Sequence, residues 1–551
     1  MRTGWRLVLF MAPLLAVGCS TATGHHQHAH DDDGPPPLYD NLGTHHQKIT
    51  TASAEAQAYF DQGLRLVYAF NYDEARRAFR EAARRDGDCA MCYWGVALTY
   101  GSNYNSPTDA ERERGAGEAI QTARANLGRA TDREQAIIEA LAVRHSPDAK
   151  GDRAALDRAY AAAMREVSRR FPDDLDAATL FADALMNLRP WHLWTEDGKP
   201  APDTEEIVHT LERVLAAAPN HPGANHLYIH AVEASPDPGR ATAAADRLGP
   251  LMPGAGHLVH MPSHIYLRVG RYADAVTANE RAVAADRAYF KKSQSSPAYR
   301  MGYYPHNIDF IWLAASMEGR SADTIRAARE FRAAVPAEMV RTMPEMETGP
   351  AAPYFALARF GRWTEILQEK APAAGQFYVM GAWHYSRGLA FAATGRAGQA
   401  RAELTALRNL AARVPRDRTI AGFFKQADML QLAGDTLAGE IAARGGDTTT
   451  AVRYFSEAIR AQDGHWFTEP PPWYFPVRQA LGAALLEGGR PAEAEAVYRA
   501  DLNRNPLNGW SLFGLAQSLH AQDRPAEASI VELRFQRAWA GADVTLTASR
   551  F

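Results

Sequence analysis

The 34 residues AQAYFDQGLRLVYAFNYDEARRAFREAARRDGDC, at positions 56–89, decide the fold of this chain. Small or apolar residues stand at positions 8, 11, 20, 24 and 27 of the stretch, and these are Gly63, Leu66, Ala75, Phe79 and Ala82. Small residues at positions 8, 20 and 27 let two helices approach each other closely. The stretch therefore predicts a hairpin of two packed helices.

The same spacing returns in units that begin at Gly381, Leu432, Phe475 and near Gly509, although the Phe475 unit places Asp501 at position 27. With this spacing the chain resembles the tetratricopeptide-repeat (TPR) proteins over most of residues 52–540. The resemblance implies an all-α, TPR-like solenoid of helical hairpins, wound into a right-handed superhelix. In such an array each unit buries its apolar face only against its neighbours.

The repeat is not regular along the whole chain. We expect irregular insertions around residues 101–109, 189–203, 290–306 and 464–476. We divide the body into an N-terminal array at 52–345, which holds a histidine-rich groove, and a C-terminal array at 346–551.

Composition excludes several classes of protein. Among 551 residues, Lys and Arg number 60 against 64 Asp and Glu, which gives a net charge of −4 and no support for nucleic-acid binding. Only three cysteines occur, so a scaffold held together by disulfides is excluded. We find no glycine-rich phosphate loop, no nucleophile elbow and no His-Glu-x-x-His, so the sequence supports no conventional hydrolase.

Residues 1–19 are predicted to be an export signal. Arg2 and Arg6 precede an apolar stretch from Leu7 to Val17, which is too short to span a membrane. The end of this stretch, Leu-Ala-Val-Gly-Cys at 15–19, resembles a bacterial lipobox, with an alanine at 16 where leucine is usual. The resemblance implies a lipid on Cys19 and an outer-membrane lipoprotein that faces the periplasm or the cell surface. The alternative is an ordinary cleaved signal peptide.

Residues 20–51 are predicted to be a flexible tether rich in His, Asp and Pro. Its histidines either hold transition metals loosely or belong to a plain polar spacer; they are His25, His26, His28, His30, His45 and His46.

Six histidines between residues 226 and 306 form the main candidate site. Two pairs are spaced by one repeat of 34 residues, His226 with His260 and His230 with His264. Counted within the repeat, the histidines fall on first helices, which line the concave groove in TPR proteins. If Pro305 opens another first helix, His306 and Asp309 join them. Spacings of 3, 4 and 7 residues place side chains on one helical stripe.

These positions predict a metal site of six imidazoles and two carboxylates: His226, His230, Glu233, His257, His260, His264, His306 and Asp309. Imidazole suits copper, zinc and iron, whereas carboxylates add harder ligands. The alternative is a groove of polar or packing residues that binds a peptide. Pro262 could kink the helix that carries His257 to His264.

Three further features are secondary candidates. Cys89 and Cys92 form a CxxC motif, for which we expect a local disulfide, redox activity or a Cu(I) site. His192 lies 34 residues before His226 but in an interrupted helix. We expect His384 to be a packing residue.

Stretches around 226–233, 257–272 and 303–306 are similar to a group of exported bacterial repeat proteins with little assigned function, which adds no catalytic residue. The main hypothesis is a lipid-anchored TPR protein whose groove binds a transition metal, alone or to act on a bound peptide. The alternatives are a plain protein-interaction scaffold in the cell envelope and a metal-dependent oxidoreductase. We expect a peptide or protein partner in the groove, attachment to a membrane through the lipid, and no nucleic acid.

Overall fold

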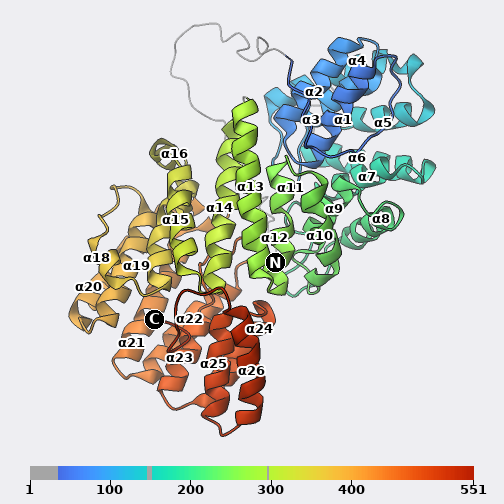
Figure 1. The fold of residues 1–551 in the computed structure, drawn as a ribbon. Coiled ribbons are helices and arrows are strands. Elements are labelled where there is room, and N and C mark those ends of the chain that lie inside the picture. The colour runs from blue at the N-terminus through green and yellow to red at the C-terminus, as the bar shows by residue number, and fades with distance from the viewer. Residues whose placement is uncertain (1–34, 146–151, 294–296) are drawn as a thin grey trace, which may run out of the picture. The chain divides into compact units, whose positions relative to one another are not determined.

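The computed structural model describes residues 35–145, 152–293 and 297–551, and it confirms the predicted all-α fold (Figure 1). In these ranges the strands β1, Thr419–Ile420, and β2, Phe424–Lys425, form one short antiparallel pair. No helix in the described part of the chain is long and apolar enough to span a bilayer. The predicted signal, Cys19 and the histidines at 25–30 lie outside the described residues.

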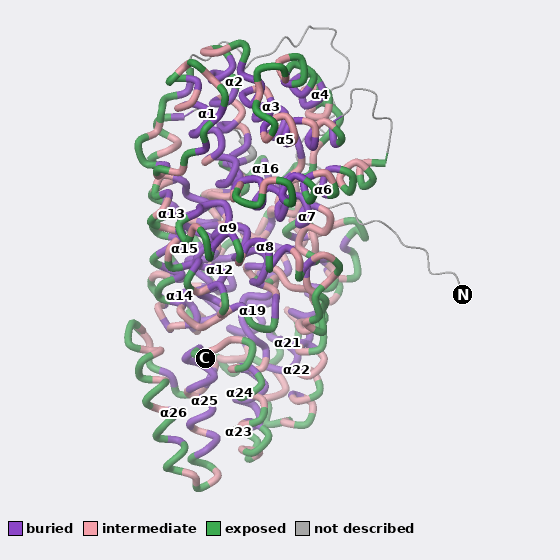
Figure 2. The backbone as a smooth tube through the Cα atoms, turned by 90° about the vertical axis from the view of Figure 1, so that its right-hand side faces the viewer, coloured by how far each residue is buried: buried purple, intermediate pink, exposed green. Residues whose placement is uncertain are grey.

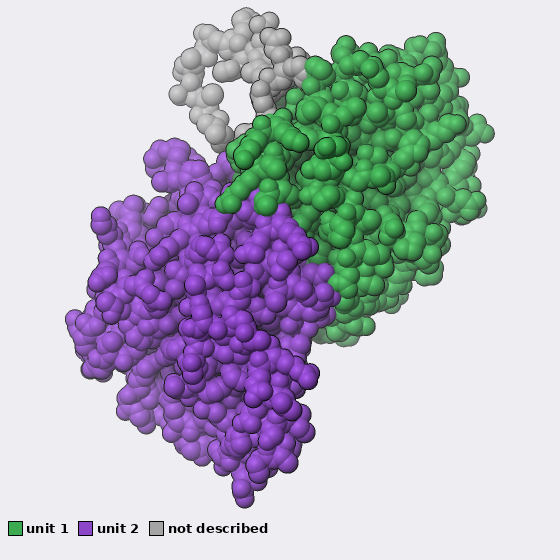
Figure 3. Space-filling model, viewed as in Figure 1, with its two compact units in different colours: residues 1–262, 284–300 green, residues 263–283, 301–551 purple. Residues whose placement is uncertain are grey.

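Contacts divide the chain into two compact units, which Figure 3 colours separately. Unit 1 comprises residues 1–262 and 284–300, and unit 2 comprises 263–283 and 301–551. This division differs from the boundary near residue 345 that we expected. The chain enters unit 2, returns to unit 1 and leaves again, because the helices α13 (Tyr272–Lys292) and α14 (Pro297–Met317) contribute residues to both units.

The helices of unit 1 are α1 Ala54–Tyr68, α2 Tyr72–Arg85, α3 Ala90–Tyr100, α4 Ala110–Ala125, η1 Leu127–Arg129, α5 Asp132–Ala142, α6 Arg153–Arg170, α7 Leu175–Met186, α8 Thr204–Ala217, α9 Pro222–Val232, η2 Pro238–Ala241, α10 Thr242–Leu251 and α11 Gly256–His260. Those of unit 2 are α12 Pro262–Val269, whose first residue belongs to unit 1, α15 Ser321–Ala334, α16 Ala337–Thr342, η3 Pro344–Glu347, α17 Thr348–Arg359, α18 Trp363–Gln368, α19 Phe377–Ala393, α20 Ala397–Ala411, α21 Gln426–Arg444, α22 Thr448–Asp463, α23 Arg478–Glu487, α24 Pro491–Arg504, α25 Gly509–His520 and α26 Pro525–Ala538.

Small residues at position 8 explain the hairpins. A Cβ added at Gly63 in α1 would lie 2.6 Å from the ring of Phe79 in α2, which stands at position 24. The unit of α21 and α22 repeats this contact, with a Cβ at Gly439 lying 2.7 Å from the ring of Phe455. Any larger side chain would push the two helices apart. The position-8 glycine and the position-24 aromatic ring are therefore one packing device that is used repeatedly.

Asp501 in α24, which departs from the repeat pattern, is fully buried. Its carboxylate accepts hydrogen bonds from Ser511 at 2.5 Å, from Asn508 at 3.1 Å and from Asn505 at 2.9 Å. A buried charge requires such partners. Asp501 therefore forms a polar junction between hairpin α23–α24 and hairpin α25–α26.

The first helix of a hairpin is buried more deeply than the second. Figure 2 shows this for the last pair, in which α25 is largely buried and α26 is largely exposed. A first helix is packed on its partner and on the neighbouring hairpins, so more of its surface is covered.

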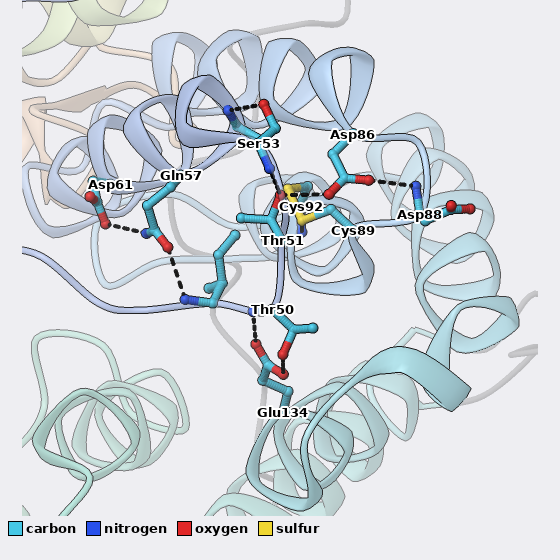
Figure 4. Close-up of a disulfide and its surroundings, with 12 residues drawn as sticks. Thr50, Thr51, Ser53, Gln57, Asp61, Asp86, Asp88, Cys89, Cys92 and Glu134 are labelled. Atoms are coloured by element: carbon cyan, nitrogen blue, oxygen red, sulfur yellow. Dashed lines mark hydrogen bonds between the residues drawn. A yellow bond between two sulfur atoms is a disulfide. The ribbon is translucent and has the colours of Figure 1, made fainter.

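Residues 35–51, which we expected to be part of a flexible tether, pack against the helices of unit 1. Leu42 and Ile49 are buried, and Thr50 donates its backbone N–H and its hydroxyl to the carboxylate of Glu134 in α5 (Figure 4). The next residue, Thr51, donates its hydroxyl to Asp86 beside the disulfide. Apolar anchors and paired hydrogen bonds fix a segment that its composition alone suggested would be solvated.

Three of the four expected insertions, around 101–109, 189–203 and 464–476, are non-helical in the structure. The fourth expectation, 290–306, is wrong, because α13 and α14 cover most of these residues. Pro305 does not open a helix but lies inside α14. Pro262 does interrupt its helix, since α11 ends at His260 and α12 begins at Pro262.

Candidate metal centre

Helix α9 places His226 and His230 one turn apart in the interior of unit 1. Pro222 stands at the first helical position, and the His221 side chain caps the helix by accepting the N–H of Ala224. All eleven residues of α9 are buried. The four-residue spacing directs both imidazoles to the same side of the helix.

His257, from α11, completes a three-histidine group with His226 and His230. The centroid of the His226 ring lies 4.9 Å from that of His230 and 4.9 Å from that of His257. Each ring offers one nitrogen, and these nitrogens lie within 4.8 Å of one another. The three side chains are at most 2% exposed.

A backbone carbonyl fixes the protonation of the His226 ring. Nδ1 of His226 lies 2.7 Å from the carbonyl oxygen of Tyr68 at the end of α1. A carbonyl oxygen only accepts, so Nδ1 must carry the proton and donate it. In the neutral ring Nε2 then has the lone pair, and it is the nitrogen that can ligate a metal.

Glu233 fixes the His230 ring in the same way. Nδ1 of His230 lies 3.0 Å from a carboxylate oxygen of Glu233, which is 1% exposed. Because an ionised carboxylate can only accept, this contact favours the proton on Nδ1 and the lone pair on Nε2. Carboxylates behind histidine ligands commonly hold the ring and raise its basicity. This contact gives Glu233 an orienting role toward the His230 ring, and its role as a direct metal ligand stays a prediction.

Aromatic side chains surround the three-histidine group. Phe70 stacks on His257 with ring centroids 5.6 Å apart, and its centroid lies 4.5 Å from that of His226. Tyr104 and Trp191 lie 5.0 and 5.8 Å from the centroid of His230. Burial first, and then the charge of Glu233, raise the pKa of Tyr104 well above its ordinary value. The group therefore lies in a region of low polarity, where neutral imidazole is favoured.

Two of these aromatic residues have unusual backbone conformations. Phe70 has φ of 53° and Trp191 has φ of 64°, in the left-handed region that bulky residues rarely adopt. Phe70 stands at repeat position 15, where other units have glycine with positive φ, as at Gly395 and Gly446. Such strain is found at functional sites more often than elsewhere. The strained backbone here presents large rings to the histidines.

His260 lies at the end of α11 and is fully buried, with its ring stacked 5.8 Å from that of His257. The remaining predicted ligands belong to unit 2. There His264 Nδ1 lies 3.1 Å from a carboxylate oxygen of Glu469, and the centroid of its ring is 5.9 Å from that of His306.

Asp309, another predicted ligand in unit 2, has a shifted pKa. Burial raises the pKa of Asp309 to about 7, although a hydrogen bond from Trp312 acts in the opposite direction and lowers it. A carboxyl with this pKa loses its proton when it binds a metal, so any metal at Asp309 would bind more tightly as the pH rises. Its role as a ligand stays a prediction.

A second cluster in unit 1, the Asp176 group, consists of His45, Asp176 and His221. One oxygen of Asp176 accepts from His45 at 2.9 Å, from His221 at 3.2 Å and from the Tyr68 hydroxyl at 2.5 Å. Burial would raise the pKa of Asp176, but the hydrogen bonds of His221 and His45 outweigh it and hold that pKa well below its usual range. These side chains line an open hollow of about 930 Å³.

The ring of His221 has the opposite protonation to that of His226. Nδ1 of His221 accepts the N–H of Ala224, so the proton of the neutral ring lies on Nε2, which faces Asp176. Neither nitrogen of His221 is then available to a metal without breaking the helix cap or the contact with Asp176. The Asp176 group is therefore a hydrogen-bond network rather than a metal site.

The secondary candidates are each accounted for locally. Cys89 and Cys92 form a disulfide at the start of α3 (Figure 4), as expected. His192 is exposed and contacts the carbonyl of Pro190. His384, which we expected in packing, is partly buried, and its Nδ1 lies 2.6 Å from Glu403.

Sequence reasoning missed the Asp176 group and the aromatic residues around the three-histidine group, which are Phe70, Tyr104 and Trp191. A signal for Phe70 was present, because a phenylalanine replaces glycine at position 15. Tyr104 and Trp191 come from two of the insertions that interrupt the repeat. Nothing in the sequence pairs Asp176 with His45 and His221, since their contact depends on the tertiary fold.

No protein-family model and no curated protein sequence matches the chain. Among solved structures, the human IFIT1 dimer with m7Gppp-AAAA is similar to it at 12% identity, with a TM-score of 0.31 and coverage of 88% of this chain and 90% of that one. Yeast Tom70 has 12% identity, a TM-score of 0.27 and coverage of 89% and 92%. The P58(IPK) TPR domain has 12% identity, a TM-score of 0.22 and coverage of 86% and 99%. Such weak likenesses assign no function, and it is the chain's own hairpins, with their glycine–aromatic contacts, that make its fold a TPR-like helical repeat.

Proposed function

We propose that the protein is a TPR-like repeat protein that binds a transition metal through Nε2 of His226 and His230 and a ring nitrogen of His257. The observation that carries this proposal is the hydrogen bonding at Nδ1 of two of the rings. Tyr68 and Glu233 each accept from Nδ1, which leaves the lone pairs of His226 and His230 on Nε2, and the three rings bring one nitrogen each within 4.8 Å of the others. Three imidazoles suit zinc, copper or iron and leave coordination positions for a further ligand.

The protein's own residues would hold and shield such an ion. Glu233 and the Tyr68 carbonyl keep two rings in place, and Phe70, Tyr104 and Trp191 exclude water from them. A bound metal would supply Lewis acidity or, for copper or iron, electron transfer. The oxidoreductase alternative needs this same centre, so a test of metal binding is also its first test.

A protein-interaction scaffold is the second candidate function. The hairpins of unit 2 favour it, because first helices of successive hairpins pack together, α19 against α21 and α23 against α25. Stacked repeats of this kind present extended surfaces to partners.

We also propose that the protein acts in the cell envelope, anchored through a lipid on Cys19. The disulfide of Cys89 with Cys92 supports an oxidising compartment. Cys19→Ser should move the protein from the membrane fraction to the soluble fraction. A wild-type protein that is already fully soluble would contradict the anchor.

Metal analysis of the purified protein tests the main proposal. The four histidines at 25–30 are first replaced by asparagine, because they could hold metal independently. We expect tight metal in this chain, and its loss as the pH falls through about 6.5, since protonated imidazole cannot ligate. The control variant His384→Ala should keep full occupancy. An absence of tight metal at pH 7.5 after incubation with zinc, copper(II) or iron(II) would refute the proposal.

A further inference from the structure

Residues 541–551 of unit 2 follow the last helix without forming one, and they lie across the first helices of three hairpins. Gln517 of α25 donates to the carbonyl of Thr547 at 3.1 Å, and Ser549 contacts the hairpin α23–α24. Arg444 of α21 donates to the carbonyl of Phe551, at the end marked C in Figure 1. Segment 541–551 thus lies on the hairpins as a bound peptide would, with bends at 543–544 and 547–549.

The guanidinium of Arg550, in this segment, contacts two carboxylates. Arg550 contacts Glu440 of α21 through one guanidinium nitrogen and Glu487 of α23, at 2.6 Å, through another. Its side chain is 9% exposed, and Glu440 is buried. Glu440 also pairs with Arg444 of its own helix at 3.3 Å, so the two carboxylates around Arg550 create a subsite that favours a further positive charge.

A small hydroxyl and an aromatic ring fill the neighbouring subsites. Ser549 is fully buried, donates to the carbonyl of Gln479 at 2.8 Å and contacts the hydroxyl of Tyr498 at 2.6 Å. The ring of Phe551 packs edge-on against Trp510 with centroids 5.6 Å apart. Leu546 joins Trp510 in a buried apolar cluster.

Asp543 attaches the start of the segment to another helix. Its carboxylate accepts the backbone N–H groups of Ser321 and Ala322, the first residues of α15, at 2.7 and 2.8 Å. Helix α15 has no side-chain cap of its own, so Asp543 supplies one. The exposed Gly541 lies between this anchor and α26, so the whole segment is joined to the hairpins through one short link.

We propose that α21, α23 and α25, each the first helix of its hairpin, form a peptide-binding surface. Segment 541–551 occupies this surface as an intramolecular ligand. The partner it fits is a non-helical protein segment with a small hydroxylated residue, an arginine and an aromatic residue in succession. Such a partner binds where segment 541–551 leaves. This inference rests on the scaffold function, names its class of partner, and is independent of the metal centre.

Cleavage of the full chain tests the proposal without building a truncated protein. A protease site is inserted after Gly541, the folded protein is cut, and a fluorescent synthetic peptide of residues 541–551 is added while its anisotropy is followed. We expect the labelled peptide to exchange into the cut protein and not into the uncut one. Peptide carrying Arg550→Glu should bind at least tenfold more weakly, and Glu440→Gln in the protein should weaken the wild-type peptide. Glu457→Gln on α22, which pairs with Arg453 outside this surface, is the matched control and should change nothing.

The outcomes separate the proposal from the scaffold function beneath it. If the cut segment stays bound against a hundredfold excess of peptide and circular dichroism shows intact helices, the segment is a fixed part of the fold and the proposal is wrong. If the charge-reversed peptide binds better than the natural sequence, the surface remains a scaffold but the partner class assigned here is wrong. If the cut protein unfolds, the uncut Arg550→Ala variant decides, because weakened contacts should then let the labelled peptide compete.

Discussion

The two histidine clusters of unit 1 look alike in composition and differ in chemistry. Each brings three potential ligands together in a buried or half-buried place, and they share Tyr68, whose carbonyl holds His226 and whose hydroxyl holds Asp176. In the three-histidine group, acceptors take the Nδ1 protons of His226 and His230. In the Asp176 group, the backbone N–H of Ala224 instead donates to Nδ1 of His221 and so occupies the lone pair of that nitrogen.

This difference shows that the proximity of ligand-type residues does not define a metal site. The direction of the hydrogen bond on the far side of each ring decides which nitrogen keeps a lone pair. When Nδ1 of a neutral ring donates to an acceptor, Nε2 keeps its lone pair and can bind a metal. When Nδ1 accepts from a donor, Nε2 carries the proton and cannot bind a metal. Three ligand-type residues in contact can therefore form either a metal centre, as proposed for the three histidines, or a structural network, as in the Asp176 group.

The largest effect should follow from removing a ligand. We expect His257→Ala to lower metal affinity by more than tenfold, because two imidazoles remain where three are needed. His221→Asn is the matched variant in the Asp176 group, since asparagine can still cap α9. It should leave metal affinity unchanged in isothermal titration. Equal losses in the two variants would contradict the distinction between the clusters.

Asp176→Asn should instead destabilise the fold. The amide cannot replace an anion that accepts from three donors, and we expect a loss of roughly 3 kcal/mol in the free energy of unfolding at pH 7. The folded-state pKa of Asp176 is lowered, so its stabilisation is complete above the unfolded pKa of about 3.9 and is lost gradually as the pH falls from there toward the much lower folded pKa. Urea unfolding at pH 7 and at pH 2 checks this, and metal affinity at pH 7 should not change. A loss that is as large at pH 2 as at pH 7 would count against the ionised network.

Asp309→Asn should stabilise the protein slightly at alkaline pH. Burial raises the pKa of Asp309 to about 7, so wild type loses stability as the pH rises from the unfolded pKa toward 7, when the buried carboxyl ionises. Asparagine stays neutral and can still accept from Trp312. We expect a gain of about 1–2 kcal/mol at pH 8 and none at pH 3.5, measured by urea unfolding. If the variant lost metal instead, Asp309 would be a ligand after all.

The smallest effect on metal affinity should come from changing an aromatic residue beside the three-histidine group. Trp191→Leu should leave metal affinity within about threefold of wild type, equivalent to less than 1 kcal/mol, because no ligand is lost. It should nevertheless speed metal release to a chelator, since the indole covers the edge of His230. Stopped-flow measurement of release compares the two proteins. Unchanged release would mean that the ring does not shield the centre.

The sequence predicted the hairpins because their packing is local. The glycine at position 8 and the aromatic residue at position 24 lie in one unit, so a spacing within about thirty residues determines their contact. It also predicted that His226, His230 and His257 lie in the same part of the fold. It could not predict that Glu233 orients a ring or that His221 caps a helix. Those roles depend on which ring nitrogen meets which backbone group, and no spacing in the sequence encodes that.

The protonation of the rings can be measured directly. In protein labelled with ¹⁵N-histidine and kept free of metal at pH 8, long-range ¹H–¹⁵N correlation spectra distinguish Nδ1–H from Nε2–H, with single His→Gln variants to assign each ring. We predict Nδ1–H for His226 and His230 and Nε2–H for His221. Nε2–H at His226 or His230, or Nδ1–H at His221, would contradict the central claim.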